Sequence, residues 1–322
     1  MPVDLSLLSN LTSVSVLAFV LGGIGFSLRA DLRIPEQAYQ VISMTLLFGI
    51  GLKGGLALHK SNPADLIQPG ILTFALGCVI PLLAFGALGL IRRLNTIDRG
   101  AIAAHYGSTS LVTFTSLLVF LDASNINYEK YVNALLVIME IPGILIGILL
   151  AGGIRSALGN RELLREVLLG KTVLLMLGGL IIGLVSGTLG VEKVAPLFVD
   201  LQPGILTLFL LNLGYLAMSR IGDLRTVGTG MTVFAIGFPL VAGFIGALAG
   251  TLFGMSVGGS AALAVLCASA SYIAAPAAVN LALPQASQSL TIVSSLGITF
   301  PFNLTLGIPI YIAMAQALAS IF

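Results

Sequence analysis

The chain has 322 residues, of which 57% are hydrophobic and 9% are charged, and its mean hydropathy is +1.07. This composition excludes a soluble domain. The net charge of +2 is too small to indicate a nucleic-acid partner, so no such partner is expected. The sequence therefore predicts an integral membrane protein that is surrounded by the lipid bilayer.

Ten apolar stretches follow one another along the chain, each long enough to span a bilayer as a helix. They lie near residues 8–28, 38–58, 69–91, 101–121, 132–153, 171–190, 201–219, 229–255, 260–283 and 290–318. Helices are expected because backbone polar groups in lipid need partners within their own segment. The first stretch has no basic region before it and nine apolar stretches after it, which favours a span over a cleaved signal peptide.

The ten stretches form two sets of five, because short motifs recur in order at an offset of about 160 residues. The recurring pairs are Leu21-Gly22-Gly23 with Leu177-Gly178-Gly179, Phe74-Ala75-Leu76-Gly77 with Phe234-Ala235-Ile236-Gly237, and Ile141-Pro142 with Phe300-Pro301. Five is an odd number, so the second set must enter the bilayer inverted, an arrangement typical of secondary transporters. We expect an all-α protein of ten transmembrane helices, in which 1–153 and 171–322 are inverted repeats joined by a connector, 154–170.

The distribution of Lys and Arg predicts the orientation. With the N-terminus outside, the inner loops hold eleven Lys and Arg residues, including every Arg. The outer side then holds only Lys53, Lys60, Lys130 and Lys193. Because positive charge is enriched in cytoplasmic loops, we expect both termini outside and the 154–170 connector in the cytoplasm.

One face of the sixth stretch carries Gly179, Gly183 and Gly187. Glycines at this spacing let a second helix approach closely. The sequence leaves open whether that helix belongs to the same subunit or to another copy of the chain.

Several other residues within the stretches are interpreted as structural. Cys78 and Cys267 are expected to be buried small hydrophobes and not a disulfide or a metal pair. His105 is interpreted as a packed or hydrogen-bonded side chain, and Asn212 and Asn303 as hydrogen-bond donors or acceptors between helices.

The fourth and ninth stretches are predicted to be broken, because small hydroxyl residues lie beside Gly or Pro at mid-membrane depth. Such hydroxyls can satisfy the backbone groups that a break releases. Half-helix N-termini aimed inward carry partial positive charge and can hold a small anion. The expected substrate contacts are Gly107, Ser108, Thr109, Ser110, Thr113, Ser269, Ser271, Tyr272 and Ala274. The alternative is ordinary Ser and Thr packing between helices.

Glu140 is the one acidic residue placed well inside a predicted span. A carboxylate at that depth should face a cavity or the protein interior. Pro142 deprives the Ile138 carbonyl of its helical partner, and Thr299 lies at the related place in the second repeat. We expect Glu140, Ile138 and Thr299 to couple transport to a hard cation such as Na⁺. The alternative is a structural carboxyl bonded to a neighbouring Ser or Thr.

No motif for chemistry on a substrate is present, neither a P-loop, nor HExxH, nor a nucleophile elbow. The sequence therefore predicts a protein that is not an enzyme and that has no cofactor.

Several segments resemble the sodium-dependent bicarbonate transporter superfamily. They are Ile50-Gly51-Leu52-Lys53-Gly54-Gly55, Asn127-Tyr128-Glu129, Glu140-Ile141-Pro142, Ser219-Arg220-Ile221-Gly222-Asp223-Leu224-Arg225 and Ala264-Val265-Leu266-Cys267-Ala268-Ser269. The resemblance runs over nearly the whole chain. It implies a five-plus-five inverted-repeat fold, a homotrimer, and Na⁺-coupled uptake of bicarbonate across a bacterial inner membrane by a rocking or elevator motion.

The chain departs from that pattern at the expected site. The Ser-Gly-Ser-Thr run of the cyanobacterial bicarbonate carriers aligns with Ser110, Leu111, Val112 and Thr113, and Tyr272 stands where those carriers have Asp. The family's long inner loop is reduced to about seventeen residues, so a PII-like regulatory partner is not expected. Two alternatives to bicarbonate symport therefore stay open: the same fold carrying a different substrate, or a sensor or scaffold that no longer transports.

Overall fold

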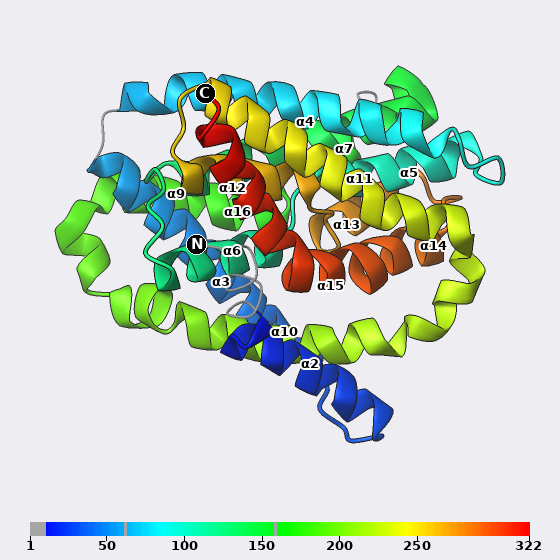
Figure 1. Ribbon diagram of the computed structural model, residues 1–322, viewed down its shortest axis with the longest axis horizontal. Helices are drawn as coiled ribbons and strands as arrows, with labels where there is room; N and C mark the ends of the chain where they lie inside the picture. The colour runs from blue at the N-terminus through cyan, green and yellow to red at the C-terminus, as the bar shows by residue number, and fades with distance from the viewer. Residues whose placement is uncertain (1–10, 61–62, 158–159) are drawn as a thin grey trace.

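The computed structural model describes residues 11–60, 63–157 and 160–322, and all regular secondary structure in these ranges is helical. The α-helices are α2 (Val14–Ser27), α3 (Glu36–His59), α4 (Ile67–Leu88), α5 (Thr96–Gly107), α6 (Leu111–Ala123), α7 (Val132–Ala157), α8 (Arg161–Leu169), α9 (Lys171–Glu192), α10 (Gln202–Ser219), α11 (Leu224–Leu252), α12 (Val257–Ala268), α13 (Ala274–Ala282), α14 (Gln288–Ile292), α15 (Phe300–Phe302) and α16 (Ile308–Ala319). Short 3-10 and π-helical turns complete them: η1 (Pro63–Leu66), η2 (Pro196–Asp200), η3 (Ile221–Asp223), η4 (Val293–Thr299) and η5 (Asn303–Gly307) (Figure 1).

Eight helical segments of the described residues are long and apolar enough to cross a membrane, where the sequence predicts ten spans. The difference lies at two places. The predicted span 8–28 begins outside the described ranges, and its described part is the 14-residue α2. The predicted span 260–283 is divided into α12 and α13, neither of which reaches the roughly 20 residues that a bilayer requires.

The helices pack as two bodies. In the first, the four-helix body, α3 lies along α9 and α2 lies along α10. In the second, the core body, α5 and α4 pack on α7, α11 and α16 pack on α12, and α6 and α13 complete the group. Figure 1 shows α4 and α11 side by side along the edge of the core body, with α2 and α10 at the opposite edge of the molecule.

The glycine face of α9 packs within the subunit. A Cβ added at Gly179 would lie 2.6 Å from the Phe48 carbonyl oxygen of α3, and one at Gly183 would overlap the Leu52 carbonyl oxygen. Gly187 has φ +59°, a conformation that favours glycine, and lies against the His59 ring. The structure thus answers the open question in favour of packing against α3.

The connector contains a helix, α8, in addition to the predicted spans. Asn160 begins α8 by accepting a hydrogen bond from the Leu163 N–H at 3.1 Å. Leu163 and Val167 are buried against α5, α7 and α13, while most of the polar side chains of α8 face outward. Helix α8 is therefore packed onto the core body along one face.

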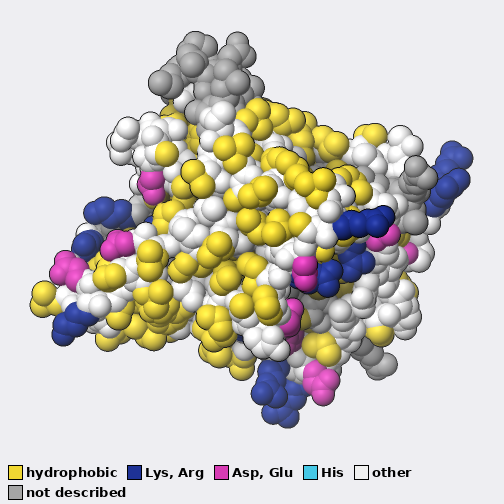
Figure 2. Space-filling model, turned by 90° about the horizontal axis from the view of Figure 1, so that it is seen from below, with side chains coloured by type: hydrophobic (Ala, Val, Ile, Leu, Met, Phe, Trp, Pro, Cys, Tyr) yellow, Lys and Arg dark blue, Asp and Glu magenta, His cyan; other side chains and the backbone are white. Residues whose placement is uncertain are grey.

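The outer surface of the helices is strongly apolar. Val185 and Leu189 on α9 are exposed by 78% and 79% of their surface. Figure 2 shows a broad hydrophobic area across one face, with groups of Lys, Arg, Asp and Glu side chains mainly toward its edges. Such a surface suits contact with lipid tails, because monomeric soluble proteins rarely expose large apolar patches.

Candidate functional site

The first break separates α5 from α6. Ser108 and Ser110 are extended, and the Ser110 hydroxyl caps α6 by accepting the Thr113 N–H at 3.3 Å and its hydroxyl at 3.0 Å. Gly107 ends α5, where a Cβ would lie 2.9 Å from the Gly143 carbonyl oxygen of α7. Glycine therefore allows the break to lie directly against α7. The non-helical part is shorter than the sequence predicts, because Thr113 already belongs to α6.

The second break separates α12 from α13. Ser269 is extended, and the Ser271 hydroxyl accepts the Ala275 N–H at 3.2 Å. The carbonyl that α12 leaves free at Ala268 accepts a hydrogen bond from the Asn303 amide at 2.9 Å. Asn303 thus bonds between helices, as predicted, and it does so at the break.

The two breaks bind each other. The Ser110 N–H donates to the Ser269 hydroxyl at 2.9 Å, and the Ser271 N–H donates to the His105 carbonyl at 2.8 Å. The His105 ring Nδ1 lies 2.6 Å from the Ser271 carbonyl oxygen, an acceptor, so Nδ1 carries the proton. This confirms the prediction that His105 is hydrogen-bonded.

The contact between the two breaks, which we call the crossing, changes which hydrogen-bond donors are available to a substrate. The N–H groups of Ser110 and Ser271, expected to face a substrate, are already engaged. Within the described residues, three buried hydroxyls have no hydrogen-bond partner, namely those of Ser108, Thr109 and Tyr272. The first two N–H groups of α6, at Leu111 and Val112, have no acceptor within their own helix. These groups are the remaining donors near the breaks.

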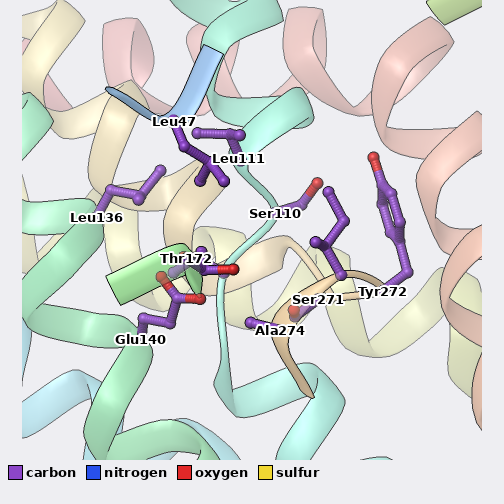
Figure 3. Close-up of a pocket in the computed structure, with 11 residues that line it drawn as sticks. Leu47, Ser110, Leu111, Leu136, Glu140, Thr172, Ser271, Tyr272 and Ala274 are labelled. Carbon is purple, nitrogen blue, oxygen red and sulfur yellow. The ribbon is translucent and has the colours of Figure 1, made fainter. Parts of the chain in front are cut away.

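A central cavity lies where the crossing meets the four-helix body (Figure 3). Its lining residues are Leu47, Thr109, Ser110, Leu111, Leu136, Glu140, Thr172, Ser271, Tyr272, Ile273 and Ala274. Figure 3 shows the Glu140 carboxylate and Thr172 on one side and Ser110, Ser271 and Tyr272 on the other. The cavity volume is about 10 Å³, about the space of one water molecule.

The structure brings together only part of the predicted site. Thr109, Ser110, Ser271, Tyr272, Ala274 and Glu140 line the central cavity, whereas Gly107, Ser108, Thr113 and Ser269 lie in or next to the breaks but outside its lining. Glu140 is 2% exposed, in α7. Its two predicted companions lie outside the lining.

Those companions are Ile138 and Thr299. Ile138 packs toward Gly70 of α4. The Thr299 hydroxyl donates to the Ala235 carbonyl at 2.6 Å and lies 2.6 Å from the Tyr106 hydroxyl. Thr299 therefore joins α11 to α5. Thr299 thus lies away from the lining of the central cavity, and its contribution to cation coupling stays a prediction.

Sequence reasoning missed the contribution of the four-helix body. Thr172, in the first turn of α9, lies beside Glu140 at the cavity, and Leu47 of α3 and Leu136 of α7 close one end of it. A lone hydroxyl at the start of an apolar span carries no signal of this proximity, because no spacing relates it to the breaks.

A second cavity, the connector-side cavity, adjoins the central one. The two share Glu140, Thr172, Ile273 and Ala274, and the connector-side cavity also has Glu166 and Lys171 in its lining. Its volume is about 220 Å³. Glu140 is thus reached from the side of α8.

Comparison with known proteins supports a membrane transport fold. No individually curated protein matches the chain. A family model described as the Na⁺-dependent bicarbonate transporter superfamily matches residues 15–316, a range that includes both bodies and both breaks. The chain is a multi-pass membrane protein and belongs to the Na⁺-dependent bicarbonate transporter superfamily.

Proposed function

We propose that the protein is a secondary active transporter that couples entry of Na⁺ to uptake of bicarbonate or a similar small anion. The family match supports the class of substrate. The observation that carries the proposal is the central cavity, which has hydroxyls of two helix breaks on one side and a buried carboxylate on the other.

The hydroxyl side suits an anion. Thr109 and Tyr272 offer hydroxyls without a partner within the described residues, and the first turn of α6 directs N–H groups toward the break. The lining has no Lys or Arg side chain. Neutral donors backed by a helix dipole bind a small anion more weakly than a buried Arg would, which permits release.

The carboxylate side suits Na⁺, which prefers oxygen ligands. Glu140 lies in α7 two residues before Pro142, which leaves the Ile138 carbonyl without its helical donor. Thr172 adds a hydroxyl oxygen from the other body. In this arrangement the coupling ion bridges the two bodies and neutralises a carboxylate that is costly to ionise in a buried place.

Transport requires movement, because a cavity of about 10 Å³ cannot hold bicarbonate. The proposed motion is a displacement of the core body past the four-helix body. The proposed ten-span, inverted-repeat architecture supports it. The half-helices α5 and α12 have equal lengths and the same offset at both ends, since 257 − 96 and 268 − 107 are each 161. The pairs α3–α9 and α2–α10 also exchange under such a symmetry.

The proposed setting is a bacterial inner membrane, with a homotrimer, external termini and a cytoplasmic connector. In a background without Cys78 and Cys267, Glu162→Cys on the exposed face of α8 tests the connector and Lys130→Cys is the matched outer position. An impermeant thiol reagent added to intact cells should label Lys130→Cys alone. Labelling of Glu162→Cys would contradict the orientation.

The direct test of function is uptake of labelled bicarbonate into proteoliposomes. We expect uptake with an inward Na⁺ gradient and none with K⁺ in its place. Glu140→Gln preserves size and removes charge, so it should abolish the dependence on Na⁺. The Ser110→Ala, Ser271→Ala double variant should lose uptake. Wild-type Na⁺ dependence in Glu140→Gln would show that this carboxyl is structural.

One observation favours a second candidate, a carrier of a different substrate. The Tyr272 ring, 5.2 Å from Phe300, and the Leu111 side chain both lie at the central cavity. They make the lining bulkier and more apolar than hydroxyls alone. A panel of small mono- and dicarboxylates in the same uptake assay, with Tyr272→Phe as a variant, separates this candidate from bicarbonate transport.

A further inference from the structure

A third cavity lies between the two bodies, on the side of the central cavity away from the connector. Its lining residues are Ile50, Lys53, Thr115, Leu118, Val119, Asp122, Asn133, Val199, Gln202 and Pro203, and its volume is about 220 Å³. Both bodies contribute, since Lys53 and Gln202 belong to α3 and α10 while Asn133 and Asp122 belong to α7 and α6. We call it the Lys53 cavity.

Lys53 is a cation without a direct counterion. Among the described residues, no carboxylate lies within 4.0 Å of its ammonium group. Asp122 lines the same cavity, but its Oδ1 accepts a hydrogen bond from the Tyr128 hydroxyl at 2.9 Å. Burial and the Asp122 charge raise the pKa of Tyr128 above its usual range, so this hydroxyl stays a donor. A half-buried ammonium group in a spanning helix is costly unless a partner compensates it.

Buried amides stand beside this ammonium. Asn133 and Gln202 are 6% and 5% exposed, and each has a side-chain NH2 group as a donor, whereas the Asn133 Oδ1, which has no hydrogen-bond partner within the described residues, is an acceptor. Gly54 makes the arrangement possible, because a Cβ there would lie 3.1 Å from the Asn133 Cβ. Thr115 donates its hydroxyl to the Leu111 carbonyl at 2.8 Å, so it offers no donor. The donors of the cavity are thus one ammonium group and two side-chain amides.

An apolar layer separates the Lys53 cavity from the central one. Leu47, Leu111 and Leu136, all nearly buried, line the central cavity on this side. Each lies one helical turn from a residue of the Lys53 cavity, namely Ile50, Thr115 and Asn133 respectively. The two cavities therefore lie in one line along the boundary between the bodies, with three leucines between them.

We propose that the Lys53 cavity is a second binding site, specific for a small monovalent anion of about the size of bicarbonate. Lys53 supplies the charge, and the side-chain amides of Asn133 and Gln202 supply further donors. Asp122, in the same lining, opposes the anion and keeps binding weak. The leucine layer holds the anion apart from Glu140 until the bodies move.

The position of the site gives it a role if the proposed function holds. It lies on the side opposite the connector, which is the outer side in the proposed orientation. Anions would collect at Lys53 before they pass the leucines. Binding at Lys53 does not depend on transport, whereas this role rests on the proposed function.

The test measures bicarbonate binding directly. Purified Ser110→Ala, Ser271→Ala protein, in which the central cavity is impaired, is titrated with sodium bicarbonate at constant ionic strength and Na⁺, with the melting temperature as readout. We expect a saturable rise. Lys53→Met should weaken the apparent affinity about tenfold or more, since a hydrogen bond from a charged group is lost. Lys53→Arg should restore most of it.

Asp122→Asn separates anion binding from the rival explanation, a water-mediated pair between Lys53 and Asp122. If an anion binds at Lys53, removal of the opposing carboxylate should tighten bicarbonate binding severalfold. If Lys53 serves only to balance Asp122, this variant should lower the melting temperature and leave the titration unchanged. That outcome would overturn the proposal, and so would an unchanged titration in Lys53→Met. If Lys53→Met does not fold, the Asp122→Asn result alone decides whether an anion binds at Lys53.

The uptake assay keeps the two proposals apart. If the wild-type protein shows no Na⁺-driven uptake but the Lys53-dependent titration is intact, symport is refuted and the second binding site is supported. If uptake is normal but the titration does not depend on Lys53, the second binding site is refuted and symport is supported.

Discussion

The four-helix body and the crossing of the two breaks are held together by opposite means. In the four-helix body, glycines bring backbones into contact, as Gly51 and Gly55 of α3 do with Gly179 and Gly183 of α9. At the crossing, hydroxyls and an imidazole bond backbone groups that are not in a helix. Intact helices need no further hydrogen bonds in lipid, so close packing suffices for them, whereas a break must replace the bonds it loses.

The boundary between the two bodies resembles neither the glycine contacts of the four-helix body nor the hydrogen-bonded crossing. There Phe19 of α2 meets Phe300 edge-on, with ring centroids 5.5 Å apart, and Leu47 lies beside Leu111 and Leu136. The central, connector-side and Lys53 cavities all lie along this boundary. Apolar contacts without fixed geometry can shift with little cost, so the boundary is the place where the bodies can move.

The largest effect is expected in the glycine contact. Gly179→Ala would place a Cβ 2.6 Å from the Phe48 carbonyl oxygen and force α9 away from α3. Overpacking of this kind costs about 3 kcal/mol, and it should lower the melting temperature in detergent by many degrees.

Gly178→Ala is the matched control on the same helix, because a Cβ there has no neighbour within 4 Å. It should leave the melting temperature unchanged or raise it. An equal fall in melting temperature in Gly179→Ala and Gly178→Ala would mean that the glycine face does not hold the four-helix body together.

A smaller effect is expected at the crossing. His105→Leu removes the ring donor to the Ser271 carbonyl and leaves that buried oxygen unpaired. The cost should be about 2 kcal/mol. His105→Asn places an amide near the position of Nδ1 and should recover part of it, as measured by thermal unfolding. No difference between Leu and Asn would show that this hydrogen bond contributes nothing.

The smallest effect is expected at the start of α12. The Glu129 carboxylate accepts hydrogen bonds from the N–H and the hydroxyl of Ser256, the N-cap of α12. Glu129→Gln keeps one acceptor and loses the charge that favours a helix N-terminus, at a cost of about 1 kcal/mol. High salt should narrow the gap between the variant and wild type in melting temperature, since screening weakens the charge effect. A difference in melting temperature that does not change with salt concentration would contradict the electrostatic explanation.

Local patterns in the sequence predicted the helices and the breaks. The apolar stretches gave segment positions to within a few residues, since a spanning helix needs only its own hydropathy and length. Ser and Thr beside Gly or Pro in the fourth and ninth stretches indicated both breaks, and the depth of Glu140 in its span indicated a cavity. Each of these follows from neighbours in the chain and from the cost of unpaired polar groups in lipid.

The tertiary structure decided what the segments face. The bond between Ser110 and Ser269 joins residues 159 apart, and the approach of Thr172 to Glu140 and of Asn133 to Lys53 depends on how whole helices pack. The pairing of Gly179 with α3, and not with another subunit, was likewise open in the sequence. Apolar helices look alike to one another at the level of composition, so their partners are chosen by shape and by a few buried hydrogen bonds that exist only once the bodies are assembled.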